Sequence, residues 1–316
     1  MLYVRAFPRP RVVVSACLNL KPVRYNGQEV RDEFVLRLLP YCEVIEVCPE
    51  VSIGLGVPRD RIIVYKKDEG FGLSQPSTGL ELTDKMESFT GEFLRSLRDI
   101  DGFILKSKSP SCGVSNTKVY RNPEGKEFYS KGKGFFAMRV LENFQDLPVE
   151  DEGRLKSPEL REHFLTRLFA LADLRESTGR MQEVSELMEF HQRYKYLLMA
   201  HSQVKLKAMG RLVANAKMEN FRETLEEYRR LFIEALKRRP SVGQHVNTII
   251  HIFGHLSKNF NPQEKAHFMR LVENNRGGKI DRKILLEFLR SYAYRFENQY
   301  LMTQTYLQPY PEDLQN

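Results

Sequence analysis

Long apolar segments are absent from this sequence of 316 residues. No apolar run approaches the roughly 18 residues that a membrane-spanning helix needs. The opening residues, MLYVRAFPRP, lack the apolar core and the small-residue cleavage site of a signal peptide. Internal repeats and low-complexity tracts are absent too, and 41% of the residues are hydrophobic, which excludes collagen-like, mucin-like and disordered proteins. We therefore expect a cytoplasmic globular protein with no membrane partner.

Cysteine is scarce, and the second half of the chain has none. The four cysteines are Cys17, Cys42, Cys48 and Cys112, whereas all seven histidines fall between His163 and His267. No local zinc motif such as CxxC with HxxxH can be assembled from them. In a reducing cytoplasm a disulfide framework is not expected. Buried apolar thiols, a metal site and a nucleophile remain as possible roles for the cysteines.

The first half alternates patterns typical of strands and helices. Short β-branched or apolar runs at residues 11–16, 43–47, 61–65 and 102–105 predict strands. Helical spacing of apolar residues follows at 29–39 and 83–97. Strands without polar alternation, separated by amphipathic helices, predict an α/β domain whose mostly parallel sheet is covered on both faces.

The second half is helical almost throughout. A helix is predicted at residues 159–174, the stretch RESTGR at 175–180 suggests a linker, and helical patterns continue to Leu307 with breaks at Pro240, Asn261-Pro262 and Gly277-Gly278. We therefore predict two domains, an α/β domain over residues 1–175 and an all-α domain over residues 181–316.

Positive charge is concentrated in the helical half. Residues 193–239 carry 12 basic and 5 acidic side chains, a plausible phosphate-binding footprint, although a solvated helix face is the commoner cause of such a count. The segment HQRYKYLLMAHS makes His191 and His201 candidates for RNA contact. Four basic side chains predict a cationic surface interleaved with Tyr194 and Tyr196: Arg193, Lys195, Lys205 and Arg211. Alternatively, the tyrosines belong to the core and the charges solvate the opposite face.

Three cysteines follow three of the predicted strands. Cys17 and Cys48 come directly after the first and second strands, and Cys112 lies in the loop after the strand GFIL. Loops beyond the carboxyl ends of parallel strands converge where α/β proteins bind ligands, so we expect these thiols to meet in one cleft. Three thiolates could hold zinc with a water or a 4Fe-4S cluster with one open iron. Cys42 lies at the opposite end of its strand and is assigned to the core.

The motifs around these cysteines resemble a known family. VSACLN, PVRYNG, VCPEVSIGLGVPR and GFILKSKSPSCG, with LPVE and EGRL further on, resemble the thiouracil desulfidase family. In the second half, HQRYKYLLMAHS, GRLV and the terminal YLMTQTYLQPYPEDLQN resemble the helical domain found fused to it. This two-domain arrangement is similar to that of the tRNA 4-thiouridine desulfidases.

The resemblance implies a 4Fe-4S cluster with three protein ligands, Cys17, Cys48 and Cys112, and one open iron. It implies hydrolytic removal of sulfur from 4-thiouridine in tRNA, giving uridine and sulfide without net redox change. Soft sulfur binds an open iron in preference to the oxygen of uridine. Glu50 is the expected acid or base and Ser109 an orienting partner, although loop capping could explain both. Substrate contacts are expected from Tyr25, Asn26 and Lys108.

This sequence departs from the family at two places. The usual CLLG is Cys17-Leu18-Asn19-Leu20, and the usual RYDG is Arg24-Tyr25-Asn26-Gly27. Asn26 cannot take a proton as an aspartate can, although it can hydrogen-bond a base edge. The departures leave open a desulfidase for free thiouracil bases, and a non-enzymatic RNA-binding sensor is a further alternative.

Three weaker signals complete the analysis. SKGKG at residues 130–134 could bind a phosphate at a helix N-terminus or serve as a flexible connector. GLGVPR contains GxG but not the dinucleotide fingerprint, so no nicotinamide cofactor is expected. His251 and His255 have the spacing of a metal face, but without a nearby HExxH arrangement we predict packed core histidines.

Overall fold

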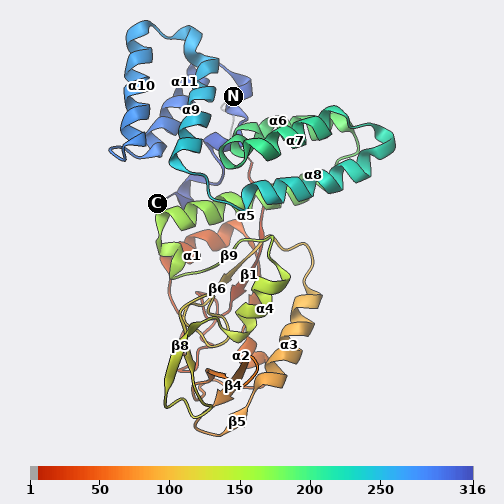
Figure 1. Cartoon of the computed structure of the whole chain (residues 1–316), viewed down its shortest axis with the longest axis vertical. Coiled ribbons are helices and arrows are strands. Elements are labelled where there is room, and N and C mark those ends of the chain that lie inside the picture. The colour runs from red at the N-terminus through yellow and green to blue at the C-terminus, as the bar shows by residue number, and fades with distance from the viewer. Residues whose placement is uncertain (1–5, 316) are drawn as a thin grey trace. The chain divides into compact units, whose positions relative to one another are not determined.

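The computed structural model describes residues 6–315, and the chain divides into two compact units (Figure 1). The α/β unit consists of Pro8–Ala172 and the C-terminal segment from Asp313, and the helical unit of Asp173–Glu312. Asp313 is bound within the α/β unit because its carboxylate accepts a hydrogen bond of 2.7 Å from the Tyr41 hydroxyl. None of the helices in residues 6–315 has the length and apolarity that crossing a membrane requires.

The first sheet of the α/β unit is entirely parallel. Its strand order is β2-β1-β6-β9, and the strands are β1 (Arg11–Ser15), β2 (Glu43–Val47), β6 (Gly102–Leu105) and β9 (Val149–Asp151). The register pairs Ser15 with Val47, and Val14 with Ile104. All four strands therefore end at the same edge of the sheet.

A second sheet holds the predicted third strand. Its order is β5-β4-β3-β7-β8, with strands β3 (Ile63–Lys66), β4 (Phe71–Gln75), β5 (Leu80–Glu81), β7 (Thr117–Tyr120) and β8 (Phe128–Gly132). Only the pairing of β3 with β7 is parallel. The prediction that residues 61–65 join the parallel sheet is therefore wrong, because their partners are strands that the sequence pattern did not indicate.

Helices cover both faces of the first sheet, as predicted. On one face Val13, Phe103 and Leu105 pack in a cluster with residues of α3 (Thr83–Ser96) and α4 (Phe135–Asn143). On the other face α5 (Pro158–Thr178) approaches so closely that a Cβ on Gly102 would lie 2.9 Å from Leu168 Cδ1. α1 (Glu33–Leu38) meets α5 through Arg161, whose guanidinium lies 5.0 Å from the Phe34 ring centroid. α2 (Pro49–Ser52) is a single turn after β2.

The helical unit is built from helices whose ends match the predicted breaks. After α5 the chain forms α6 (Val184–His201), α7 (Gln203–Ala214), α8 (Phe221–Leu236), α9 (Val242–Leu256), α10 (Pro262–Arg276), α11 (Arg282–Arg295) and α12 (Gln299–Met302). Ser241 and Asn261 begin α9 and α10 by capping boxes with Gln244 and Glu264. α5 runs on to Thr178 through much of the predicted linker at residues 175–180.

The N-terminus of α4 holds the loop that carries Cys112. The backbone N–H groups of Gly134, Phe135 and Ala137 donate to the carbonyls of Gly113, Pro110 and Ser111 at 2.7, 2.8 and 3.0 Å. Neither alternative for SKGKG is found: carbonyl oxygens take the N–H groups that a phosphate would use, and Ser130–Gly132 belong to β8 and not to a flexible connector. A Cβ on Gly134 would lie 2.5 Å from the Ser111 backbone, so only glycine allows the approach.

Gly134→Ala is expected to lower the free energy of unfolding of the α/β unit by about 1–3 kcal/mol, because its methyl group must displace the backbone beside Cys112. Gly91→Ala within α3 is the matched control, because only the flexible Arg95 side chain contacts its Cβ. The control should gain about 0.5–1 kcal/mol from helix propensity. Urea unfolding of the full chain, with hydrogen exchange of the α/β peptides, measures both. Equal stability of the two variants would contradict the steric argument.

Candidate functional site

The three cysteines follow three neighbouring strands of the parallel sheet. Cys48 comes directly after β2 and Cys17 two residues after β1, while Cys112 lies in the loop between β6 and β7. The strand placement expected from the sequence is therefore found. Cys42 precedes β2 at the opposite edge and is buried, as predicted.

Burial raises the pKa of each of these thiols, and neighbouring thiolates raise it further for Cys17 and Cys112. The pKa of Cys17 is raised to about 12, first by burial and then by Cys48. Burial also raises the pKa of Cys48. The pKa of Cys112 is raised well above its usual value by burial and by Cys17, Glu50 and Cys48, against a hydrogen bond with Ser15 that lowers it. Because charge repulsion of this kind acts over short distances, the three thiols share one environment.

As ligands, the three cysteines fit an iron–sulfur cluster better than a single metal ion. Among residues 6–315, no group of three or more His, Cys, Asp or Glu is spaced to hold one metal ion. In a cluster, each cysteine binds a different iron, so the ligand sulfurs need not converge on one point. Thiolates that repel one another in a buried place are stabilised by a cationic partner. Cys17, Cys48 and Cys112 are the thiols that could hold such a cluster.

Glu50 lies beside the cysteines and is fixed through both carboxylate oxygens. Oε2 accepts from Arg59 Nε at 3.0 Å and Nη2 at 2.5 Å, and Oε1 accepts from Ser111 Oγ at 3.0 Å. The side chains of Arg59 and Glu50 are only 6% and 13% exposed. Arg59 also donates to the Val23 carbonyl at 3.1 Å, which ties the loop after β1 to that after β2. The sequence analysis quoted VCPEVSIGLGVPR but assigned Arg59 no role.

Ser109 shapes the Cys112 loop. Its hydroxyl accepts from the backbone N–H groups of Ser111 and Cys112 at 3.2 and 3.0 Å, and its carbonyl accepts from the Thr117 hydroxyl at 3.0 Å. These bonds correspond to the turn-forming alternative weighed for this serine. Ser111, two residues further on, is the hydroxyl that contacts Glu50.

A charged pair that the sequence analysis missed lies next to Cys17. Lys106 follows β6 and Glu152 follows β9, and the Lys106 ammonium donates to the Glu152 carboxylate. Glu152 also accepts from the Ser107 N–H at 2.7 Å and its hydroxyl at 2.6 Å. The Lys106 charge lowers and the Glu152 charge raises the pKa of Cys17. Placement after parallel strands was the signal that could have identified this pair.

The predicted substrate contacts lie on exposed loops. Tyr25 is 48% exposed, and Asn26 and Lys108 are exposed as well. The Asn26 amide nitrogen donates to Gln28 Oε1 at 2.9 Å, and the Tyr25 carbonyl accepts from the Arg59 N–H at 2.7 Å. In the departure from CLLG, Asn19 adopts a φ of 57° and bonds Asp32 through both side-chain atoms.

Of the basic side chains predicted to contact RNA, some form ion pairs with carboxylates of this chain and others do not. Arg193 pairs with Asp173 at 3.0 Å and Lys205 pairs with Glu234. Arg211 is exposed, and Lys195 lines a pocket described below. The interleaving of Tyr194 and Tyr196 with a cationic surface is wrong, because α6 packs both rings into the core, 0% and 2% exposed.

The histidine assignments are also partly corrected. His201 is buried and bonds the Arg238 carbonyl at 2.9 Å, so it is a core histidine. His251 and His255, predicted as packed core residues, are both exposed, and His255 contacts the Tyr196 hydroxyl through Nε2.

Comparison with known proteins gives two family matches and several relatives. Residues 12–152 match the family model of 2-thiouracil desulfurase, and residues 195–311 match DUF1722, a family of unknown function. "Uncharacterized protein YbgA" of Escherichia coli (strain K12) is 24% identical over 148 residues, covering 46% of this chain and 88% of YbgA. "Uncharacterized protein YbbK" of Bacillus subtilis (strain 168) is 28% identical over 109 residues, covering 32% of this chain and 72% of YbbK.

One solved structure is also similar. The 4Fe-4S-dependent thiouracil desulfidase TudS is 29% identical and covers 49% of this chain and 97% of its own, with a TM-score of 0.37. The two family matches give this chain a two-domain arrangement, with a 2-thiouracil desulfurase domain first and a DUF1722 domain second.

Arg59→Met is expected to destabilise the α/β unit by about 3–5 kcal/mol, because it leaves the buried Glu50 carboxylate without its cation. The double variant Arg59→Met with Glu50→Gln removes both charges and should recover part of that loss. Urea unfolding of wild type, both single variants and the double variant forms a complete cycle. Additive losses would show that the pair is not coupled.

Proposed function

We propose that this chain is an iron–sulfur-dependent desulfidase that removes sulfur from 4-thiouridine in tRNA. The observation that carries the proposal is the position of Cys48, Cys17 and Cys112 after three neighbouring parallel strands, within residues matched by the 2-thiouracil desulfurase model. The reaction is a hydrolysis. The oxygen of water bonds to the thiocarbonyl carbon, the carbon–sulfur bond breaks, and sulfide leaves with the protons of water.

The three cysteines are the proposed ligands of the cluster. A 4Fe-4S cluster held by Cys17, Cys48 and Cys112 would supply a Lewis acid suited to a soft thiocarbonyl sulfur. The fit rests on the buried thiol of Cys112 and the partly buried thiols of Cys17 and Cys48, whose charged forms raise the pKa of Cys112. Lys106, whose charge lowers the pKa of Cys17, adds a cation near this thiol.

Glu50 is the proposed proton acceptor for the attacking water. Arg59 and Ser111 hold its two carboxylate oxygens, so its position is fixed before substrate binds. Ser111 lies next to Cys112 in the chain and contacts Glu50 Oε1 at 3.0 Å, so its hydroxyl is suited to relay the proton. Ser109 supports this arrangement indirectly by forming the turn that presents Ser111 and Cys112.

The helical unit is the proposed tRNA-binding part. The excess of basic over acidic side chains in residues 193–239 and the exposed Arg211 support phosphate contact. Exposed Tyr25, Asn26 and Lys108 are the proposed contacts to the thiolated base. A second candidate function is desulfidation of free thiouracil, which the description of the matched family favours.

After anaerobic reconstitution with iron and sulfide, the full chain should remove the thiocarbonyl absorbance of 4-thiouridine-containing tRNA and release an equal amount of sulfide. Cys17→Ser, Cys48→Ser and Cys112→Ser should each abolish turnover and lower the bound iron. Cys42→Ala is the matched control, because this buried thiol lies at the opposite edge of the sheet. Turnover of free thiouracil alone would favour the second candidate, and no turnover of either substrate by a loaded protein would overturn the proposal.

Arg211→Glu should weaken tRNA binding about tenfold or more and reduce its salt dependence, because an exposed phosphate contact becomes a repulsion. Free thiouracil turnover should be unchanged, since the base does not need the helical unit. Binding isotherms at several salt concentrations, beside thiouracil kinetics, measure both effects. Equal losses with both substrates would contradict the assignment of tRNA binding to this surface.

A further inference from the structure

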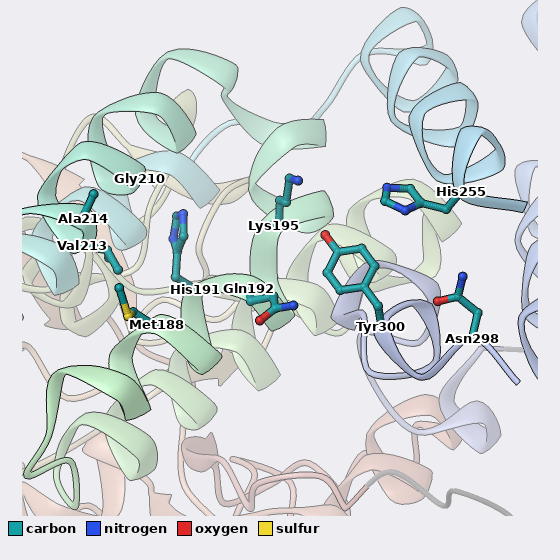
Figure 2. A pocket seen from close by; sticks show the side chains of 10 residues that line it. All are labelled: Met188, His191, Gln192, Lys195, Gly210, Val213, Ala214, His255, Asn298 and Tyr300. Carbon is teal, nitrogen blue, oxygen red and sulfur yellow. The ribbon is translucent and has the colours of Figure 1, made fainter.

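A cavity of about 730 Å³ opens within the helical unit (Figure 2). α6 contributes four lining residues, α7 three, α9 one, and α12 with the residue before it two: Met188, His191, Gln192, Lys195, Gly210, Val213, Ala214, His255, Asn298 and Tyr300. Figure 2 shows Lys195 and Gln192 between His191 and Tyr300. The volume lies in the range of cavities that hold small molecules.

Three polar side chains that line this cavity are held by hydrogen bonds to residues outside its lining. His191 Nδ1 is bonded to the buried Tyr228 hydroxyl at 3.2 Å, and His255 Nε2 to the Tyr196 hydroxyl at 2.6 Å. Asn298 Oδ1 accepts from the Leu301 N–H at 3.1 Å, which leaves its amide nitrogen as a donor. His191, His255 and Asn298 therefore each keep a second polar atom for a ligand while one hydrogen bond fixes their orientation.

Gly210 keeps the cavity open next to His191. A Cβ at this position would lie 3.7 Å from His191 Nε2, so a longer side chain would extend into the cavity. A glycine inside helix α7 costs about 1 kcal/mol relative to alanine. Gly210 therefore lowers the stability of α7, and helix formation alone does not explain a glycine at this position.

The cavity carries one positive charge and no negative charge. Lys195 is its only charged lining residue, and no carboxylate pairs with Lys195 in the described part of the chain. Burial and then Lys195 lower the pKa of His191 to about 4, and the same two causes lower the pKa of His255. Both imidazoles are therefore neutral at pH 7, available as hydrogen-bonding and stacking groups beside a single cation.

An aromatic wall lies next to that cation. The His255 and Tyr300 ring centroids are 5.2 Å apart with an interplanar angle of 38°. Bases stack on rings of this kind, while amides such as Gln192 and Asn298 hydrogen-bond base edges, and ammonium groups bind phosphate. A simple inorganic anion would use Lys195 but none of the other groups.

We propose that this cavity binds one nucleotide, with its phosphate at Lys195 and its base against His255 and Tyr300. A free nucleotide and a nucleotide exposed on RNA present the same chemistry. The inference deepens the proposed function, and it rests on that function only for tRNA as the source of the nucleotide. The cavity would hold one nucleotide of the tRNA in the helical unit while another part of the same RNA reaches the cysteines.

The test uses the full chain, with titration of uridine and adenosine monophosphates followed by calorimetry, and of tRNA followed by filter binding. Lys195→Met should weaken nucleotide binding about tenfold, and Gly210→Leu should abolish it by filling the cavity. Lys258→Met, in the exposed turn after α9, is the matched control outside both the cavity and residues 193–239, and should leave nucleotide and tRNA affinity unchanged. Circular dichroism verifies that each variant is folded.

The outcomes separate the two sources and the two proposals. Losses with monophosphates indicate a free nucleotide as a sufficient ligand. Losses with tRNA alone, with the salt slope reduced by about one, indicate a nucleotide within RNA. If Lys195→Met and Gly210→Leu bind both probes as wild type does, the nucleotide site is overturned. Failure of wild type to desulfidate any substrate overturns the proposed function instead, and leaves this binding comparison valid.

Discussion

Parallel pairing of β1 with both β2 and β6 is the constraint on which the candidate site depends. Because β1 lies between the other two, the residues after Ser15, Val47 and Leu105 leave the sheet side by side. The Ala16 N–H continues this pairing with a bond of 2.8 Å to the Val47 carbonyl, and the Lys106 N–H donates to the Ser15 hydroxyl at 2.9 Å. Loops that begin from common positions need little further ordering to bring their side chains together.

The thiols do not stabilise the site by themselves. Burial and mutual repulsion disfavour their charged forms, as the raised pKa values of Cys17 and Cys112 indicate. The surrounding polar bonds hold the loops instead. Arg59 binds the first two loops together, and the N-terminus of α4 binds the third. The three loops that carry Cys17, Cys48 and Cys112 are thus positioned by polar bonds that do not involve the thiols.

The sequence predicted those parts of the fold that depend on local pattern. Strands buried on both faces are continuous apolar runs, so β1, β2 and β6 were found within a residue of their ends. β4 and β8, with sequences FGLSQ and FYSKG, mix glycine and polar residues and are held mainly by pairing with distant strands. Periodicity does not report such pairing, and the second sheet was therefore missed.

The site residues divide in the same way, into those that local sequence pattern indicates and those that depend on contacts between distant segments. The cysteines were found because strand ends can be located from sequence. The partners of Glu50 were not, because Arg59 is nine and Ser111 sixty-one residues away in the chain. The tyrosines of α6 illustrate the opposite error. Tyr194 and Tyr196 stand among basic residues in the sequence, but α8 and α9 pack on that helix and bury both rings.

The bond between Tyr41 and Asp313 gives the α/β unit an uncommon order of synthesis. Its sheets are complete once residue 151 has been made, but the segment from Asp313 arrives only after the whole helical unit has been translated. The α/β unit therefore lacks this contact until residue 313 has been made. A recombinant fragment that stops at residue 172 would remain permanently in that intermediate state.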